Sequence, residues 1–172
     1  MPVIGVALSI PEPWASDLQA YRTRIDPSAA TIPTHITLVP PTVVDDDGLG
    51  VVEDHLTAVA GDVPAFDVHL RGTGTFRPIS PVVFISLVEG ISQTEQLAAA
   101  VRTGPLDVDV DFPFHPHVTV AHHLDAAVMD RAFDDLAEFD AAFAVGGFHL
   151  YVHDDAEGWR PTREFPLARA SG

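Results

Sequence analysis

One short pattern occurs twice in this chain and limits its possible folds more than any other feature. The segment His35-Ile36-Thr37-Leu38 returns 82 residues later as His117-Val118-Thr119-Val120, and prolines lie close to both copies. The alternation of polar and apolar residues in each copy is typical of a strand. Because residues i and i+2 of a strand share a face, each copy presents an imidazole beside a hydroxyl on one face and an apolar surface on the other. The repetition predicts two related halves.

The rest of the chain alternates between strand and helix patterns. Expected strands lie at 2–10, 34–39, 65–76, 81–88, 117–122, 142–153 and 163–168, and expected helices at 14–25, 49–60, 92–102 and 125–139. We expect the second strand to stop at Pro40–Pro41, Ser92 to cap the third helix with Glu95 three residues later, and Asp125 to start the fourth. Several strands come in adjacent, hairpin-like pairs. This favours an α+β fold with antiparallel pairing over a doubly wound parallel sheet.

Length and composition limit the class of protein. A chain of 172 residues lies within the size range of one compact unit, so we expect a single bilobal domain over 1–172. The 25 acidic residues outnumber the 9 basic residues, all of which are arginine, and the formal charge is −16. Such a field disfavours tight, non-specific binding to long nucleic acid, but it allows a small phosphate ester or a single RNA end. The absence of cysteine excludes disulfides and thiolate chemistry.

Hydropathy gives no sign of a membrane or export segment. No run of about 18 apolar residues occurs. The N-terminal segment MPVIGVALSI is shorter than a signal peptide and lacks its basic flank. We therefore expect a cytoplasmic protein that does not contact a membrane, and we expect it to be a monomer.

Two His-x-Thr strands brought side by side would form a site suited to a phosphate. Hydroxyl groups can donate to non-bridging oxygens, and a protonated imidazole adds a charged donor. The ordinary histidine pKa of about 6.5 suits proton transfer near neutral pH. One neutral imidazole would deprotonate a water or a ribose hydroxyl, while the other would protonate the leaving oxygen. We predict that His35 and His117 are catalytic and that Thr37 and Thr119 bind the phosphate, without a metal or other cofactor.

At these residues the chain resembles the two-histidine (2H) phosphoesterase superfamily, in particular bacterial proteins labelled 2'-5' RNA ligase or RNA 2',3'-cyclic phosphodiesterase. PTHITLVPP is similar to the first family motif and FHPHVTVAH to the second. The resemblance implies a bilobal fold with antiparallel sheets lining a central cleft and helices outside. It assigns catalysis to His35 and His117, and phosphate contacts to Thr37 and Thr119.

The same resemblance implies the substrate class. Family substrates are RNA ends and small nucleotides with a 2',3'-cyclic phosphate, which is opened to a 2'-phosphate, and the reverse reaction forms a 2'-5' linkage. Many ligase-like members carry arginine just after the second motif, where this chain has His122. Together with the acidic composition, this difference favours a small substrate over RNA.

Other residues near the motifs are weaker candidates. Arg77 and Arg71 could reach a phosphate, and His115 could line the rim of the site. A wall that stacks on a base could be built from aromatic residues, with core packing as the alternative for each: Phe76, Phe114, Tyr151 and Trp159. The remaining histidines have no motif partner, and we interpret them as surface or hydrogen-bonded core residues: His55, His69, His149 and His153.

Two other functions compete with the enzyme hypothesis. A binding module of the same fold would hold a nucleotide or an RNA end without turnover, but it has no need of two imidazoles. A metal-binding protein is suggested by the histidines around the second motif, His115, His117, His122 and His123. Their spacing is not a standard zinc pattern, and strand parity turns His122 away from His117. A metal-independent phosphodiesterase is therefore the main hypothesis.

Overall fold

The strands of the computed structural model, which describes residues 1–108 and 113–169, form one continuous antiparallel sheet. The strands are β1 (Val3–Ser9), β2 (His35–Val43), β3 (Phe66–Thr75), β4 (Val82–Glu89), β5 (His117–His122), β6 (Asp140–Val145), β7 (Gly147–Asp154) and β8 (Gly158–Pro166). The α-helices are α1 (Trp14–Ile25), α2 (Leu49–Asp62), α3 (Ile91–Val101) and α4 (Ala126–Asp135). Short 3-10 turns, Pro27–Thr31 and Gly104–Leu106, follow α1 and α3. The predicted α+β class with antiparallel pairing is confirmed.

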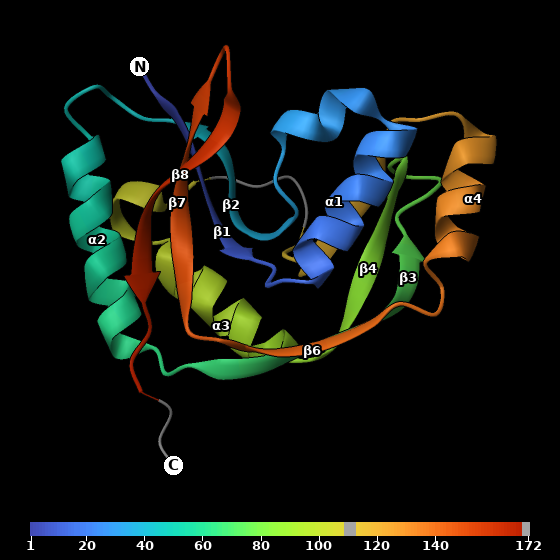
Figure 1. Ribbon diagram of the computed structural model, residues 1–172. Helices are drawn as coiled ribbons and strands as arrows, with labels where there is room; N and C mark the ends of the chain where they lie inside the picture. Colours follow the sequence, from blue (N-terminus) through green and yellow to red (C-terminus); the bar gives the residue numbers. More distant parts are fainter. Residues whose placement is uncertain (109–112, 170–172) are drawn as a thin grey trace.

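The strand order, β6-β3-β4-β5-β2-β1-β7-β8, consists of two four-stranded halves that meet between β5 and β2. We call β2, β1, β7 and β8 the first lobe, and β5, β4, β3 and β6 the second lobe. The unit β1-α1-β2 corresponds to the unit β4-α3-β5. Each connecting helix crosses the junction, since α1 packs on β5 and α3 packs on β2. In Figure 1, α2 and α3 lie on one side of the molecule and α1 and α4 on the other, with β1 and β2 between them.

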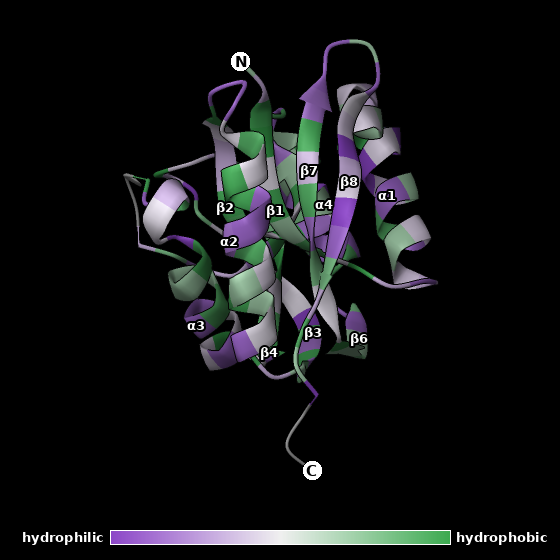
Figure 2. Cartoon of the chain, turned by 90° about the vertical axis from the view of Figure 1, so that its left-hand side faces the viewer, coloured by the Kyte–Doolittle hydropathy of each residue, from purple (hydrophilic) through white to green (hydrophobic). Residues whose placement is uncertain are grey.

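The two faces of β2 and β5 have opposite characters. Ile36, Leu38 and Val118 are completely buried beneath the helices, as the apolar halves of both motifs require. Across the sheet as a whole, Figure 2 shows that β1 is mostly hydrophobic, whereas the outer strand β8 carries a hydrophilic stretch. Burial of a large aliphatic side chain contributes roughly 1.5–3 kcal/mol. The apolar face therefore anchors the two motif strands and leaves their polar face free for chemistry.

Proline does not end β2, contrary to our expectation. The strand continues through Pro40 and Pro41 to Val43, and its register against β1 shifts between the pairs Val6–Val39 and Ile4–Thr42. This shift is a β-bulge, at which one residue of the longer strand has no partner. A proline at a bulge removes no ladder hydrogen bond, and so the strand tolerates both.

Other boundaries also differ from the prediction, and the last strand, β8, spans Gly158–Pro166 rather than 163–168. The α3 N-cap is Gly90, with a left-handed φ of 87°, and not Ser92. Helix α4 ends at Asp135 rather than 139. The single strand expected at 142–153 is two strands, β6 and β7, separated at Gly146. These two strands belong to different lobes, so the chain passes from the β6 edge of the sheet to the first lobe at the dipeptide Gly146-Gly147.

None of the helices in the described ranges is long and apolar enough to span a membrane. The assignment of 1–172 to one domain, the monomeric state and the cytoplasmic location stay predictions.

Replacing Ile36 with alanine should lower the free energy of unfolding by about 2–5 kcal/mol, because the side chain is fully buried at the junction of the lobes. The matched control is Ile79→Ala, since Ile79 is 82% exposed and its truncation should change stability by about 0.5 kcal/mol or less. Urea unfolding of both variants measures the difference. Equal losses would contradict the placement of Ile36 in the core.

Candidate active site

A single residue pair joins β2 to β5 and brings the two motifs together. Ile36 is paired with Val118 in antiparallel register. One residue to either side, this register sets His35 opposite Thr119 and Thr37 opposite His117, all on the face away from the helices. Side chains opposite each other on one face of an antiparallel pair have Cβ atoms about 4.5–5.5 Å apart. The pairing thus gathers two imidazoles and two hydroxyls at the centre of the molecule.

Both imidazoles are held by the same local contact. His35 Nδ1 lies 2.6 Å from the carbonyl oxygen of Pro33, and His117 Nδ1 lies 2.6 Å from the carbonyl oxygen of His115. A carbonyl oxygen only accepts, so each Nδ1 must donate and carries the proton. In the neutral ring, each Nε2 is therefore the nitrogen atom without a proton. His35 Nε2 lies 3.0 Å from Thr37 Oγ1, whose hydroxyl donates to it when the ring is neutral.

Burial favours the neutral form of both rings. Burial lowers the pKa of His35, and the charge of the buried Arg22 guanidinium lowers this pKa further. The hydrogen bond to the Pro33 carbonyl acts in the opposite direction and raises it. The pKa of His117 is lowered first by burial, and then by the charges of His115 and His35, while its bond to the His115 carbonyl raises it. A negative phosphate between the rings would favour their charged forms. The lowered pKa values thus favour two neutral imidazoles, and an anion between them would favour protonation.

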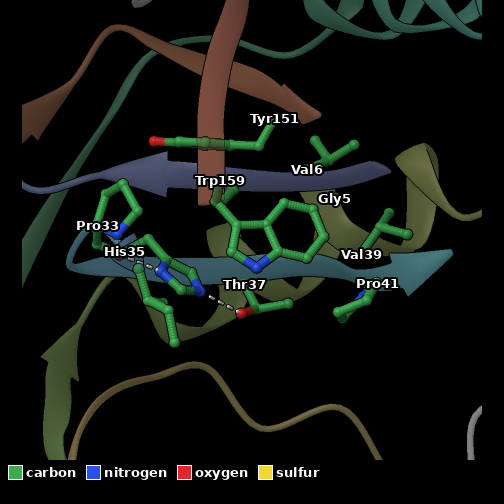
Figure 3. A pocket seen from close by; sticks show the side chains of 11 residues that line it. Gly5, Val6, Pro33, His35, Thr37, Val39, Pro41, Tyr151 and Trp159 are labelled. Atoms are coloured by element: carbon green, nitrogen blue, oxygen red, sulfur yellow. Dashed lines mark hydrogen bonds between the residues drawn. The ribbon is translucent and has the colours of Figure 1, made fainter. Parts of the chain in front are cut away.

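An apolar pocket of about 220 Å³ opens beside His35 in the first lobe. Its floor includes the backbone of β1 at Gly5, and its walls include Tyr151 and Trp159. In the view of Figure 3, Tyr151 and Trp159 lie on either side of the β1 ribbon, and His35 and Thr37 project from β2 next to Trp159. The rings of His35 and Tyr151 are 6.5 Å apart between centroids. Burial raises the pKa of Tyr151, so its phenol stays protonated at neutral pH.

The surroundings of His117 in the second lobe are filled by aromatic rings. The ring centroids of Phe76 and Phe84 lie 5.1 and 5.2 Å from that of His117. The ring of His115 lies 5.8 Å from it and also contacts both phenylalanines. The two motif histidines therefore share their backbone contact but not their neighbours.

Comparison with known proteins identifies the family. Residues 10–157 match the sequence model of the 2'-5' RNA ligase superfamily. The chain belongs to this superfamily. The resemblance to two-histidine phosphoesterases is thereby confirmed.

Relatives and solved structures agree with this assignment. Proteins named as phosphoesterases from Oceanobacillus iheyensis and Bacillus licheniformis are 27% and 29% identical, over 96% and 86% of this chain and 98% and 88% of theirs. The structure of Escherichia coli LigT with 3'-AMP matches with a TM-score of 0.73 at 22% identity, covering 98% of this chain and 100% of LigT. The TT0787 protein of Thermus thermophilus matches with a TM-score of 0.67 at 22% identity over the whole of both chains. At these identities the two structures show the shared superfamily fold.

The weaker sequence candidates lie in different places within this superfamily fold. Tyr151 lines the pocket, and His115 lies beside His117. Phe114 packs under the Arg102 guanidinium, 4.9 Å from its ring centroid, at the edge of the core. Arg77 is paired with Asp130 of α4 at 2.7 Å. The other arginine, Arg71, is 70% exposed and lies 3.9 Å from Asp140.

The sequence predicts the positions of Trp159 and His149 only in part. Core packing is the alternative that the sequence leaves open for Trp159, but its ring covers Gly5, where an added Cβ would lie 3.6 Å from the indole. The sequence predicts that His149 is a surface or hydrogen-bonded core residue. It is paired with Ala7 of β1, and its buried Nδ1 has no hydrogen-bond partner in the structure as described. No local sequence signal marks either residue, because Trp159 reaches the pocket, and His149 reaches β1, through strand pairing.

Within residues 1–108 and 113–169, no three His, Asp or Glu side chains are arranged to hold a metal ion. His122 and His123 are exposed, and their rings contact each other at a centroid distance of 4.0 Å.

Nitrogen-15 NMR should find His35 and His117 as neutral Nδ1–H tautomers with pKa values below about 6.5, because a carbonyl accepts from each Nδ1 and burial opposes the charged ring. His35→Ala and His117→Ala spectra assign the two signals. An Nε2–H tautomer at either ring would contradict the described contacts.

Proposed function

We propose that this protein is a metal-independent phosphodiesterase that hydrolyses a 2',3'-cyclic phosphate, on a nucleotide or an RNA end, to a 2'-phosphate. His35 and His117 act as the acid–base pair. The observation that carries the proposal is the equivalence of the two rings: each donates its Nδ1 proton to a carbonyl oxygen two residues earlier, which leaves two Nε2 atoms for proton exchange. A module that only binds nucleotides would not require this duplication.

The reaction follows from these two nitrogen atoms. One neutral imidazole accepts a proton at Nε2 from a water molecule, whose oxygen forms a bond to phosphorus. The bond between phosphorus and the ribose 3'-oxygen breaks, and the other imidazole, protonated, donates its Nε2 proton to that oxygen. The product is a 2'-phosphate, and the pair is left with its protons exchanged. An alcohol in place of the water would run the same chemistry toward transfer rather than hydrolysis.

The threonines and the buried surroundings stabilise the charge that develops on the phosphate. The hydroxyl of Thr37 can turn from His35 Nε2 to a non-bridging oxygen, and Thr119 faces the same volume from β5. Hydrogen bonds to a charged group are about twice as strong as neutral ones. No metal ion is required in this scheme, because side chains supply the acid, the base and the donors.

A small nucleotide or an RNA terminus is the proposed substrate. The formal charge of −16 opposes binding of long polyanions, and the apolar pocket beside His35 is smaller than the roughly 300–1,000 Å³ typical of drug-sized ligand sites. Structures of E. coli LigT have been determined with 3'-AMP, NADP+ and ATP. The shared fold and family make a nucleotide the natural class to test here.

His35→Ala and His117→Ala should each lower the hydrolysis rate by about 10²–10⁴-fold, the usual contribution of a general acid or base. Thr37→Ala and Thr119→Ala should lower kcat/KM by about 10- to 150-fold, since each removes one hydrogen bond to a charged group, worth roughly 1.5–3 kcal/mol. The assay is hydrolysis of the four nucleoside 2',3'-cyclic monophosphates with EDTA present, resolving 2'- from 3'-phosphate.

The matched control for the histidine variants is His69→Ala. His69 pairs with Asp140 of the edge strand β6 and lies outside the motifs, so its removal should leave the rate within about twofold of wild type. Near-normal turnover by either motif-histidine variant would refute the paired mechanism. Binding without turnover by the wild type would instead support the nucleotide-binding module.

The pH dependence should reveal the lowered pKa values. Because burial holds the pKa of both rings below about 6.5, one charged and one neutral ring coexist in the free enzyme mainly on the acid side of that value. We expect a bell-shaped kcat/KM profile with its maximum below about pH 6.5. Bound phosphate raises both pKa values, so the kcat profile should peak at higher pH. A rate that rises continuously to about pH 9 would contradict this assignment.

A further inference from the structure

The two lobes present equivalent positions around the motif histidines. On β1, Ala7 is paired with Thr37 of the first motif. On β4, Phe84 is paired with Thr119 of the second motif. In both strand pairs the register shifts next to this position, between Val6 and Ala7 on β1 and between Val83 and Phe84 on β4. Ala7 and Phe84 therefore occupy the same place relative to the two halves of the site.

The equivalence extends to the next strand of each lobe. Ala7 is paired with His149 of β7, and Phe84 is paired with Gly74 of β3. Two residues before Ala7 on β1, Gly5 is paired with Tyr151 of β7. Its counterpart in the second lobe is the contact in which Phe76 N–H donates to the carbonyl oxygen of Val82, at 3.1 Å. Tyr151 and Phe76 are thus the matching aromatic residues, and the small residues Gly5 and Ala7 match Val82 and Phe84.

The small residues leave the first lobe open. Above Gly5 and Ala7 lies the 220 Å³ pocket, walled by Tyr151 and Trp159 and bordered by His35. Gly5 allows Trp159 to lie directly on the strand, since even a Cβ there would already contact the indole at 3.6 Å. A flat, apolar group attached to a phosphate at His35 would meet two aromatic side chains in this pocket.

The large residues close the corresponding space in the second lobe. Phe84 is only 6% exposed, and its ring lies over Gly74, where an added Cβ would stand 2.6 Å from the ring. The ring centroid of Phe76 lies 4.5 Å from that of Phe84. Both rings also pack against His115, so the surface next to His117 is filled by side chains that pack on one another.

We propose that the site accepts an organic group on one side of the phosphate only, the His35 side. This inference rests on the proposed phosphodiesterase function and narrows its substrate class to a terminal 2',3'-cyclic phosphate whose base lies between Tyr151 and Trp159. In a cyclic phosphate, both ester oxygens belong to one nucleoside, so the opposite side needs room only for water. An internucleotide 2'-5' linkage carries a second nucleoside, which would meet Phe84 and Phe76. The site therefore hydrolyses cyclic ends and does not join or cleave 2'-5' linkages.

Three phosphodiesters separate the alternatives: adenosine 2',3'-cyclic phosphate, glycerol 1,2-cyclic phosphate, which lacks a base, and 2'-5'-linked diadenosine monophosphate. Stacking of a base on aromatic side chains contributes about 5- to 150-fold to affinity. Wild-type kcat/KM for the cyclic nucleotide should exceed that for the glycerol ester by at least about tenfold. Turnover of the 2'-5' dinucleotide should be below about 1% of that of the cyclic nucleotide, a difference of at least about 100-fold. Comparable turnover of the cyclic nucleotide and the 2'-5' dinucleotide would overturn the proposal.

Gly5→Val is the variant that tests the pocket. Valine suits a strand, and the first added carbon makes ordinary contacts, but its methyl groups must displace the Trp159 ring. The preference for the cyclic nucleotide over the glycerol ester should fall about tenfold, consistent with the loss of base stacking. The control is Gly146→Val, in the β6–β7 connection, where an added Cβ meets nothing within 4 Å and the preference should stay as in wild type. An unchanged preference in Gly5→Val would overturn the pocket assignment.

A binding measurement distinguishes failure of this inference from failure of the proposed function. If the wild type turns over neither cyclic ester, the proposed function is wrong. Calorimetry then compares 2'-AMP with inorganic phosphate. If the affinity for 2'-AMP relative to phosphate falls about tenfold in Gly5→Val but not in Gly146→Val, a one-sided nucleoside pocket is still supported. The same relative affinity in the wild type and both variants would refute it.

Discussion

The site depends on the pairing of Ile36 with Val118. This is the one register pair between β2 and β5, and it is where the two lobes of the sheet meet. Because the side chains of a strand alternate, a slip of one residue there would turn a histidine and a threonine toward the helices. Both apolar residues are fully buried, so the hydrophobic core fixes the register that the chemistry needs. Helices α1 and α3, which cross the junction, reinforce it.

The backbone then gives each half of the site the same chemical state. A carbonyl oxygen two residues before each motif histidine, in Pro33 and in His115, accepts the Nδ1 proton. A hydrogen bond to the backbone needs no particular side chain, so the two copies can differ in sequence at that position and still fix one tautomer. Burial lowers the pKa of both rings, and an anion would restore their charge. The equivalent backbone contacts thus hold both imidazoles in the same tautomer.

The sequence predicted the elements that depend on local pattern. The motif strands, α1 and the antiparallel class follow from periodicity, and β5 lies at the predicted residues. Periodicity could not show that Gly146 separates two strands of different lobes, or that Pro40 and Pro41 lie in a bulge, because both depend on a partner strand. The pocket was harder still. Trp159 and Gly5 lie near opposite ends of the chain and meet only through β7.

The two lobes share a backbone plan, and their difference therefore lies in side-chain volume. In the second lobe the large residue is on β4 and glycine is on β3, so Phe84 lies across Gly74 and fills the face. In the first lobe the small residue is on β1 and the larger one on β7, so Ala7 lies between Thr37 and His149 and the face stays open. The two lobes thus place the larger side chain on different strands of the equivalent pair, and the register of the strands stays the same. A duplicated fold can in this way keep two equivalent histidines and still present its ligand with two unequal sides.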